Sequence, residues 1–481
     1  MYRTTLIILI TVLLLSGVLI AVFPTAAMVV LAMNFLMALF LAYQKLVLAT
    51  AKQNDSRGPI ADVTQPPFIS IHIAACSEPV NSVIETIKAA SRQRYQNFEV
   101  IVLYNNTANE KLWRPVEAFC ESLYNVKFYN YSQVEGYKAG ALNICRELMH
   151  RDTQFILTLD ADYILQKNAL ATAVLNLEQQ EVDLLQFPQA YNNHMASNGL
   201  AAELQHYFKS YSASAGKINM NLPTGTLSLV NIKCLEAIGG WPTESITEDA
   251  FLGIELIKNN CRIGYCDREI GKGIMPSSAL DLKTQRMRWI FGNFQTLIHT
   301  ITSPQLDVAS KQILAAQLTS WINLNGLPWL YIILVGTLSQ FANVANAQIL
   351  LTLSITTIAL HSVIQIFIFY KGLGSFSRAL NSYSIHIANS VEGSFTWWGY
   401  LWSSDRPFAR TDKFGKNVGL DVEQFVFNAV LMLAAVLIYT TFSPVLGVAT
   451  LLLAATRIFA RIHLFLNLKD ARNQLIKFNT L

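Results

Sequence analysis

Long apolar runs frame one long stretch of mixed composition in this chain. The first two runs, residues 4–23 and 25–50, are separated at Phe23-Pro24. Each is close to the ~20 residues needed to cross ~30 Å of hydrocarbon. The second run follows the first at once, with no polar small-residue cleavage site between them. The pair therefore predicts a retained helical hairpin rather than a secretory signal peptide.

Four further apolar runs lie late in the chain, at residues 313–338, 347–370, 425–442 and 445–459. The last run is short, and it is adequate for a span if Arg457 and Arg461 extend their charged ends to the interface. Lys and Arg in short flanking loops favour the cytoplasmic side. With six spans, all basic flanks fall on one side, which places both termini and residues 51–312 in the cytoplasm.

The apolar runs also predict the domain organisation. We expect a transmembrane hairpin at 1–50, a cytoplasmic domain at 51–312, the third and fourth spans at 313–370, an interfacial segment at 371–421, the fifth and sixth spans at 422–461 and a cytoplasmic tail at 462–481. The fold class is then an α/β domain inserted in a multi-span α-helical membrane protein with about six transmembrane helices.

The insert alternates buried-strand patterns with helical patterns. Strands are predicted at 68–74, 98–103, 126–129 and 154–159, and helices at 81–92, 138–150 and 250–258. This alternation predicts a mainly parallel sheet with helices on both faces. In such sheets ligands bind beyond the carboxyl ends of the strands, so residues just after a strand are the first candidates for a site.

The composition agrees with a membrane protein. Apolar residues make up 52% of the 481 residues and charged residues only 14%, with mean hydropathy +0.33. Soluble globular proteins carry about a quarter charged residues, so a wholly soluble chain, a disordered chain and a disulfide-rich secreted module are excluded. The net charge of +4 gives no reason to expect a nucleic-acid partner. Six cysteines show neither C-x-x-C pairing nor Cys/His ligand spacing, which indicates buried thiols in a reducing compartment.

Asp160 and Asp162 follow directly on the strand predicted at 154–159. Carboxylates at i and i+2 on an extended segment point to the same side, and together they can hold a hard divalent cation. The alternative is a turn in which Asp accepts local backbone hydrogen bonds.

A glycine-rich segment, Gly136-Tyr-Lys-Ala-Gly-Ala-Leu-Asn143, opens the helix predicted at 138–150. Glycines, Lys138 and a helix start form a plausible cradle for an anion. The segment lacks the GK[ST] ending of a Walker loop. Its alternative interpretation is an ordinary helix start.

The segment Thr247-Glu-Asp249 leads into the helix predicted at 250–258. Ser245 and Glu248 fit an S-x-x-E capping box, so Glu248 could serve only as a helix cap. Asp249 is not needed for that box. It is either a partner of the helix dipole or a general base.

Gln285, Arg288 and Trp289 immediately precede the third predicted span. On a helix these side chains share one face at i, i+3 and i+4. The set combines donors for phosphate with a flat ring that can stack on a sugar. The alternative is an interfacial anchor, since Arg and Trp are common at the level of the lipid headgroups.

The order of these motifs resembles that of the processive family-2 glycosyltransferases, which include the cellulose, hyaluronan and other β-glucan synthases. An N-terminal hairpin, KAGALN, DxD, TED and Q-x-x-R-W occur in that order before further spans. In addition, Phe408-Ala-Arg-Thr-Asp-Lys413 is similar to the F-x-V-T-x-K gating loop of the cellulose synthases, with Arg410 in place of Val. The resemblance covers nearly the whole chain.

The resemblance implies a GT-A-type (Rossmann-like) domain and an inverting, processive synthase. Such an enzyme polymerises a β-linked polysaccharide, here in the first place a β-glucan from UDP-glucose, and exports it through its own transmembrane channel. The implied location is the plasma membrane, which is the inner membrane of a bacterium. The implied partners are a UDP-sugar donor, the growing polysaccharide, the lipid bilayer and a Mg²⁺ or Mn²⁺ cofactor, while accessory export proteins stay open.

The family pattern also implies a role for each motif residue. The T-E-D motif is catalytic, with Asp249 as general base beside Thr247 and Glu248, and Asp162 binds the cation. Donor and acceptor binding are assigned to Asp160, Lys138, Asn143, Asn105, Gln285, Arg288, Trp289, Thr411 and Lys413. The last two belong to the gating loop and close over the nucleotide.

Two departures refine the resemblance. Asn105-Asn106-Thr107 follows the second strand, where the family usually has a carboxylate pair at the nucleotide base. An amide can still hydrogen-bond uracil, and this triplet resembles a bacterial subset associated with β-1,3- and cyclic β-glucans, which favours a β-1,3-glucan over cellulose. The chain ends shortly after the sixth span, so we expect no cyclic-di-GMP-binding β-barrel.

Polar residues inside two predicted spans fit the export of a polymer. They are Gln317, Ser320, Trp321, Asn323, Asn325 and Trp329 in the third span, and His361 and Gln365 in the fourth. Such groups usually face a bundle interior or a wet cavity, and hydrogen bonds between helices are the alternative. Residues 376–402, with Trp397, Trp398 and Trp402, predict an interfacial helix that leads to the gating loop.

Two other functions stay open at the level of sequence. A non-processive transferase that acts on a lipid carrier would share the catalytic motifs, but Q-x-x-R-W and the gating loop favour a synthase. A transporter or channel with an inactive transferase domain is disfavoured by the intact Asp160, Asp162 and Asp249.

Overall fold

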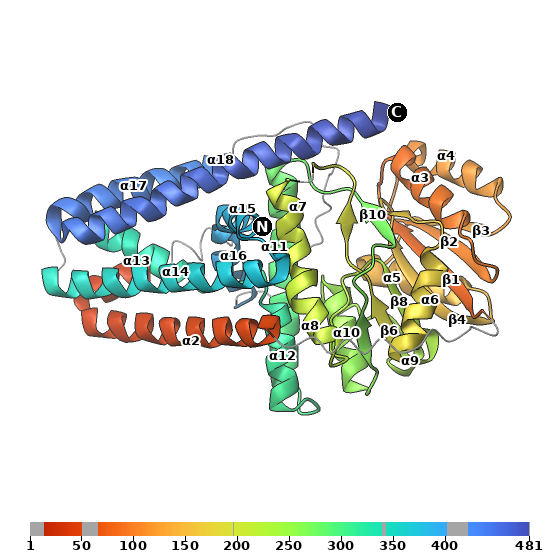
Figure 1. The fold of residues 1–481 in the computed structure, drawn as a ribbon, viewed down its shortest axis with the longest axis horizontal. Helices are drawn as coiled ribbons and strands as arrows, with labels where there is room; N and C mark the ends of the chain where they lie inside the picture. The colour runs from red at the N-terminus through yellow and green to blue at the C-terminus, as the bar shows by residue number, and fades with distance from the viewer. Residues whose placement is uncertain (1–13, 51–65, 196, 339–342, 402–421, 481) are drawn as a thin grey trace.

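A computed structural model describes residues 14–50, 66–195, 197–338, 343–401 and 422–480. An α/β domain stands at one end of the long axis of the molecule, and a set of long helices stands at the other end (Figure 1). The helix pair α11 (Ala279–Thr302) and α12 (Val308–Leu318) lies between these two parts. The site described below forms where the α/β domain meets the intervening helices.

The α/β domain is built on a sheet of seven described strands. In spatial order they are β3 (Val126–Tyr131), β2 (Phe98–Asn105), β1 (Phe68–Ala75), β4 (Thr153–Asp160), β8 (Ser228–Asn231), β6 (Leu184–Gln186) and β9 (Ile263–Tyr265). The first four run parallel, whereas β8 is antiparallel to both of its neighbours. The four predicted strands are confirmed, but the sheet is mixed because the short strand β8 reverses the direction.

Helices pack on the sheet as the alternation predicts. α3 (Val80–Ser91), α5 (Tyr137–Leu148) and α10 (Glu248–Lys258) confirm the predicted helices, and α4 (Glu110–Glu121), α6 (Ala169–Gln180) and α9 (Ile232–Ala237) add to them. In α3, Val83, Ile87 and Ala90 recur at i, i+4 and i+7 and are fully buried in the core. Three short strands, β5 (Ile164–Leu165), β10 (Gly271–Gly273) and β7 (Ala190–Tyr191), form a second sheet.

Four of the described helices are long and apolar enough to cross a membrane: α2 (Pro24–Thr50), α14 (Val344–Leu373), α17 (Val422–Thr441) and α18 (Pro444–Thr480). They expose large apolar side chains such as Leu36, Val363, Phe425 and Phe459, as expected for contact with lipid. These helices match the second, fourth, fifth and sixth predicted spans. Of the first predicted span, the structure describes residues 14–23, and residues 14–22 are helical.

The third predicted span, residues 313–338, is wrong as a single helix. α12 ends at Leu318, and the short apolar helix α13 (Gly326–Thr337) begins only after a non-helical turn at 319–325. α12 lies across the direction of α2 and α14 (Figure 1). The first part of the predicted span, residues 313–318, therefore belongs to α12 in the intervening layer.

Distant parts of the chain stabilise the turn at 319–325. Lys45 Nζ donates a hydrogen bond to the Ile322 carbonyl (2.9 Å), and the Asn323 N–H donates to the Gly393 carbonyl (3.2 Å). The Asn323 side-chain oxygen accepts from the Ser394 hydroxyl (2.6 Å). A break in a membrane helix needs such partners for its freed backbone groups. The polar residues of this segment therefore stabilise a break in the helix, which their pattern alone does not predict.

Arg457 corrects the prediction for the sixth span. Its guanidinium is fully buried, not extended to the membrane interface, and it donates to Asn428 (3.1 Å), Ser390 (2.6 Å) and Gln424 (2.8 Å). The three acceptors compensate for the loss of hydration of the charge. The span needs no arginine at its end, because the helix continues through the predicted tail to Thr480.

The C-terminal half of α18 packs against the start of α7 (Gly199–Tyr207). Asn198, the N-cap residue of α7, donates from its side chain to the Asp470 carboxylate (2.7 Å). The Gly199 N–H donates to the side-chain oxygen of Asn467 (2.6 Å). One helix thereby connects the membrane segments to α7, which lines the site.

Short helical segments complete the intervening layer. α7 continues into a π-helical turn, η1 (Phe208–Ser212), and then α8 (Ala213–Gly216). The predicted interfacial helix at 376–402 is wrong in its continuity, because α15 (Phe376–Ala388), α16 (Ser390–Phe395) and η3 (Thr396–Leu401) are separate. At the first junction the Asn389 side chain turns back to the Ile385 carbonyl (2.9 Å). The gating-loop match at 408–413, with Thr411 and Lys413, lies outside the described residues.

Candidate active site

Three predicted motifs meet at the carboxyl end of β4. Asp160 ends β4, Lys138 lies in the first turn of α5, and Glu248 opens α10. The Lys138 ammonium donates to the Asp160 carboxylate and to the Gly225 carbonyl (2.7 Å), and it lies 3.9 Å from the Glu248 carboxylate. Burial opposes the charge of Lys138, but Asp160, Glu248 and Asp249 outweigh it and raise the pKa of Lys138. We call Lys138, Asp160 and Glu248 the charged cluster.

Asp249 lies in the first turn of α10, next to the charged cluster. One of its carboxylate oxygens accepts the N–H of Ala250 (2.8 Å). Burial, and secondarily the charge of Glu248, raises the pKa of Asp249 to about 7. A general base is most effective when its pKa lies near the operating pH, so this carboxyl group has the property that the predicted role requires.

Gly225 allows the backbone to approach Asp249 closely. Its φ of +78° lies in the left-handed region that favours glycine. A Cβ at this position would lie 2.9 Å from an Asp249 carboxylate oxygen and 3.4 Å from Lys138 Nζ. The Gly225 backbone is therefore part of the wall between the charged cluster and Asp249.

The capping box predicted for Ser245 and Glu248 is wrong. α10 begins at Glu248 with Thr247 at the N-cap, and the Thr247 side chain makes no capping hydrogen bond. The Ser245 hydroxyl instead accepts the Thr247 N–H (3.2 Å) and lies 3.4 Å from the Gly292 carbonyl of α11. A Cβ at Gly292 would lie 2.5 Å from the Thr247 hydroxyl, so this glycine lets the T-E-D segment pack against α11.

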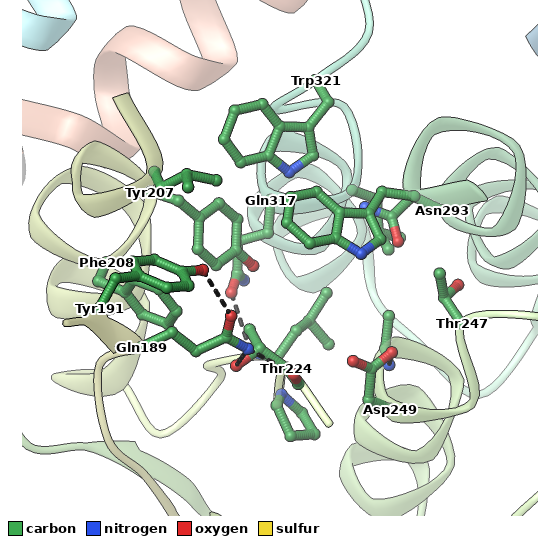
Figure 2. A pocket seen from close by; sticks show the side chains of 16 residues that line it. Gln189, Tyr191, Tyr207, Phe208, Thr224, Thr247, Asp249, Asn293, Gln317 and Trp321 are labelled. Atoms are coloured by element: carbon green, nitrogen blue, oxygen red, sulfur yellow. Dashed lines mark hydrogen bonds between the residues drawn. The ribbon is translucent and has the colours of Figure 1, made fainter. Parts of the chain in front are cut away.

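A pocket opens beside Asp249 (Figure 2). Its aromatic lining consists of Tyr191, Tyr207, Phe208, Trp289 and Trp321, and we call this set the aromatic pocket. Figure 2 shows Trp321, Tyr207 and Tyr191 arranged around the space that faces Asp249. Phe208 reaches the pocket from the π-helical turn η1, a distortion that is frequent at functional sites.

Polar groups at the rim of the aromatic pocket are held by hydrogen bonds. The Tyr191 hydroxyl donates to the Gln189 side-chain oxygen (3.2 Å), and the Gln189 amide donates to the Thr224 carbonyl (2.8 Å) (Figure 2). Gln317 also lines the pocket, and its side-chain oxygen accepts the Leu222 N–H (2.9 Å). Aromatic walls with a few placed polar groups are typical of a binding site for a small molecule such as a sugar.

A buried ion pair behind the aromatic pocket was not predicted from the sequence. Arg286 donates to the Glu203 carboxylate, and the two side chains are 2% and 1% exposed. The Arg286 guanidinium lies 3.7 Å from the ring centroid of Trp321 and 5.0 Å from that of Trp289. The ion pair therefore supports both indole rings. A sequence signal exists, because Arg286 precedes Trp289 by three residues on one helix.

The predicted Q-x-x-R-W residues reach both sides of Asp249. Trp289 lines the aromatic pocket, with its ring centroid 5.7 Å from that of Trp321. Arg288 lies near the charged cluster: burial lowers its pKa, while Glu248, Asp160 and Asp249 act in the opposite direction. Gln285 is buried in α11. One helix thus contributes to the charged side and to the aromatic side.

Two residues that were predicted to bind the sugar donor form hydrogen bonds with the protein backbone. Asn143 exchanges two hydrogen bonds with the backbone of Trp241 (2.8 and 2.9 Å), and so supports the turn that precedes the T-E-D segment. Asn105 is buried at the end of β2, and its amide donates to the Ala75 carbonyl (3.2 Å). The structure places Asn143 in a supporting position and Asn105 between the ends of two strands.

Asp162 is half-buried in the turn between β4 and β5, two residues after Asp160. Carboxylate oxygens are ligands that Mg²⁺ and Mn²⁺ prefer, so the two residues fit a hard divalent cation. Lys138 already neutralises Asp160. The role of Asp162 as the metal ligand stays a prediction from the sequence.

Two family models match the chain. The model described as Glycosyl transferase family 2 covers residues 70–239, and the model described as Glycosyl transferase family group 2 covers residues 155–370. Together they include the charged cluster, Asp249 and the Q-x-x-R-W helix. Thr411 and Lys413 lie beyond both.

The curated relatives include polysaccharide synthases. The chain is 21% identical over 268 residues to the poly-β-1,6-N-acetyl-D-glucosamine synthase of Staphylococcus epidermidis, which is 54% of this chain and 62% of that protein. It is 22% identical over 253 residues to the UDP-forming cellulose synthase catalytic subunit of Xanthomonas axonopodis pv. citri, which is 51% of this chain and 34% of that protein. The chain thus spans less than two thirds of either relative.

A solved structure matches the fold. The mannosyltransferase PcManGT from Pyrobaculum calidifontis, in complex with GDP-Man and Mn²⁺, superposes with a TM-score of 0.53 at 16% identity, over 75% of this chain and 99% of that chain. The fold is therefore GT-A-type with a central mixed sheet. The matched part of the chain, residues 70–370, is thus a family-2 glycosyltransferase domain whose curated relatives include polysaccharide synthases.

Proposed function

We propose that this protein is a membrane-embedded, processive synthase that polymerises a β-linked polysaccharide from a UDP-sugar. The specific product we propose is a β-glucan made from UDP-glucose. The observation that carries the proposal is the position of Asp249, between the charged cluster and the aromatic pocket. A donor diphosphate fits the charged side, and the sugar end of an acceptor fits the aromatic side. The cellulose synthase relative from Xanthomonas axonopodis pv. citri is UDP-forming, which supports a UDP-sugar donor.

In the proposed reaction Asp249 takes the proton of the acceptor hydroxyl. The hydroxyl oxygen forms a bond to the anomeric carbon, while the bond from that carbon to the diphosphate breaks and UDP leaves. Attack opposite to the leaving group inverts the anomeric centre. Lys138 and Arg288 offset the negative charge that develops on the diphosphate. Thr247 and Glu248 hold Asp249 at the start of α10.

Asp162, with Asp160 beside it, would hold a Mg²⁺ or Mn²⁺ ion. Such an ion, when bound, neutralises the charge of the leaving diphosphate. The mannosyltransferase from Pyrobaculum calidifontis, which has a similar fold, was solved in complex with GDP-Man and Mn²⁺. The carboxylates of this chain fix where the diphosphate is held relative to Asp249.

The remaining predicted ligands keep more specific roles in the proposal. Gln285 and Trp289 hold the acceptor from α11, and Asn105 lies where the nucleotide base would be recognised. Asn143 acts through the turn that it supports. Thr411 and Lys413 close over the bound nucleotide. Closure that excludes water is a common device in transferases.

We also propose that the polymer leaves through the membrane helices. Trp321 and Gln317 of the pocket are followed by Asn323, which lines a second cavity with Lys45, His361 and Gln365. Polar groups at this depth usually face a pathway or a bundle interior. This cavity is only about 10 Å³, so passage of a sugar chain requires the helices to separate. In this proposal the α/β domain lies in the cytoplasm at the plasma membrane.

The test is an assay of detergent-purified protein with a panel of nucleotide sugars. We expect UDP-glucose and a divalent cation to yield a long polymer whose linkage analysis shows β-glucan, and we expect chelation of the cation to abolish synthesis. Asp249→Asn serves as the inactive variant, and Asp152→Asn, at an exposed Asp outside the site, as the matched control. Addition of one sugar to a lipid would indicate a non-processive transferase. Absence of nucleotide release with every donor would contradict any transferase function.

A further inference from the structure

Asp183, Cys234 and Cys261 lie together at the edge of the sheet opposite the charged cluster. One carboxylate oxygen and the two sulfur atoms lie within 4.8 Å of one another. Asp183 precedes β6, Cys234 lies in α9, and Cys261 lies in the turn between α10 and β9. Neither cysteine forms a disulfide. The fold thus brings together three side chains that can bind a metal ion and that are too far apart in the sequence to form a local motif.

Strand directions place this group away from the active site. β8 runs antiparallel to β4, so that Asn231, at its carboxyl end, pairs with Phe155 near the start of β4. β6 and β9 both begin at the same edge, directly after Asp183 and Arg262. Asp160 and the charged cluster stand at the other end of these strands. A ligand bound here cannot touch the donor.

Backbone hydrogen bonds fix the three side chains relative to one another. The Asp183 N–H donates to the Arg262 carbonyl (2.8 Å), and the Arg262 N–H donates to the Asp183 carboxylate (2.8 Å). The Asn231 N–H donates to the Asp183 carbonyl (2.8 Å). Arg262 directly follows Cys261, and Asn231 is the N-cap residue of the helix that carries Cys234. The ligands are therefore held in place by the sheet edge itself.

We propose that Asp183, Cys234 and Cys261 form a binding site for a soft divalent transition-metal ion, with Zn²⁺ as the first choice. Two thiolates and one carboxylate are ligand types that Zn²⁺ accepts, at about 2.3 Å for sulfur and about 2.0–2.2 Å for oxygen. Both thiols release a proton on binding, and water completes a four-coordinate shell. Mg²⁺ prefers oxygen ligands, so this site differs in chemistry from the one proposed at Asp162.

The consequence of such a site is structural. Cys261 lies just beyond the end of α10, and Asp249 lies in the first turn of the same helix. A bound ion would join the far end of α10 to α9 and to the start of β6. An ion that binds only the folded state raises the stability of that state. We therefore expect the ion to raise the unfolding temperature without taking part in sugar transfer.

Titration with Co²⁺, a spectroscopic substitute for Zn²⁺, tests the proposal in the full-length, reduced, metal-free protein in detergent. We expect one equivalent of Co²⁺ to give a thiolate-to-cobalt charge-transfer band that Zn²⁺ removes. Cys234→Ser and Cys261→Ser should abolish the band and weaken Zn²⁺ binding by more than the 10–100-fold typical of losing an outer-shell partner. Cys145→Ser, at a buried thiol of α5, is the matched control and should behave as wild type.

Two results would overturn the proposal. One is a reduced wild-type protein that shows no thiolate band and no tightly bound Zn²⁺. The other is a Cys234→Ser variant that keeps both. Circular dichroism shows that each variant is folded. The band reports only on sulfur ligands, so neither result depends on the proposed reaction or on the oxygen ligands of Asp162.

Discussion

The two sides of Asp249 are built in different ways. On the charged side, Asp160 ends β4 and Lys138 lies at the start of α5, and the Lys138 ammonium donates to both the Asp160 carboxylate and the Gly225 carbonyl. On the aromatic side, the rings come from β7, α7, η1, α11 and the turn at 319–325, and the buried Glu203–Arg286 pair supports the two indole rings. The sheet therefore fixes one side, while packing between helices and membrane segments fixes the other.

This difference separates two kinds of effect. A change on the charged side alters groups that are already partly exposed, and it should affect chemistry more than folding. A change on the aromatic side alters buried groups with several neighbours, and it should affect both acceptor binding and stability. The following experiments test whether the two sides behave in these ways, from the largest expected effect to the smallest.

Asp249→Asn removes the proton acceptor between the two sides while keeping the size of the side chain. We expect sugar transfer to fall by about 10²–10⁴-fold, the loss typical of a missing general base. Binding of UDP and cation should stay near the wild-type level. Turnover and nucleotide binding, measured on the same preparation, check this prediction. Loss of donor binding in the variant would place Asp249 with the charged cluster instead.

Arg286→Met leaves Glu203 buried without its partner. Breaking a buried ion pair from one side costs about 3–5 kcal/mol, so the variant should unfold at a clearly lower temperature than wild type. The double variant with Glu203→Gln removes both charges, and it should recover much of the loss. Thermal unfolding in detergent measures both. Equal stability of wild type and Arg286→Met would show that the pair does not support the aromatic side.

Trp321→Ala removes one ring of the aromatic pocket. An aromatic platform for a flat ligand contributes about 1–3 kcal/mol, so acceptor-dependent elongation should fall by about 5–150-fold. UDP affinity should change little, because the ring lies on the other side of Asp249. Trp113→Ala, at a tryptophan of α4, controls for the loss of an indole elsewhere. A loss of UDP affinity equal to the loss of elongation would remove the distinction between the two sides.

The pH dependence of turnover should reflect Asp249. A base with a pKa of about 7 is mostly protonated at pH 6, where about one tenth is ionised, so transfer at limiting donor should be about tenfold lower at pH 6 than at pH 8. The rate profile between pH 5 and 9, at fixed ionic strength, measures this. A flat profile in that range would contradict the raised pKa.

The raised pKa of Asp249 affects the free energy of unfolding in the opposite direction: stability falls, whereas turnover rises, as the pH increases. The native state binds the proton of Asp249 more tightly than the unfolded state, so this contribution to stability is present at acidic pH and is lost as the pH rises through about 7. Asp249→Asn removes this dependence. The variant should therefore lose less stability than wild type between pH 6 and pH 8.

Local patterns were enough to predict the charged side. β1, β2 and β4, and the start of α5, follow from apolar alternation and helix periodicity, and parallel strand ends bring Lys138 and Asp160 together. The capping box failed although its pattern was local, because the Ser245 hydroxyl binds Thr247 and faces α11. The packing of this segment against α11, which the local pattern does not include, therefore determined how α10 begins.

The aromatic side depends on contacts between distant residues. The break at 319–325 needs a hydrogen bond from Lys45, which is 277 residues away from Ile322. Burial of Arg457 needs acceptors on α16 and α17. A hydropathy pattern marks a charged residue as the end of a span and carries no information about hydrogen-bond partners that are distant in the sequence. The broken third span and the buried Arg286 therefore became visible only in the folded chain.

The length of α18 fixes how its apolar N-terminal part is positioned relative to α7. Asn467 and Asp470 bind the start of α7 more than twenty residues after the helix begins at Pro444. Each residue added to an α-helix advances it by about 1.5 Å and turns it by about 100°. A one-residue deletion before Asn467 would rotate both side chains away from α7, whereas substitutions on the lipid face would leave them in place. We therefore expect related sequences to differ by substitutions along that face of α18 more often than by insertions or deletions before Asn467.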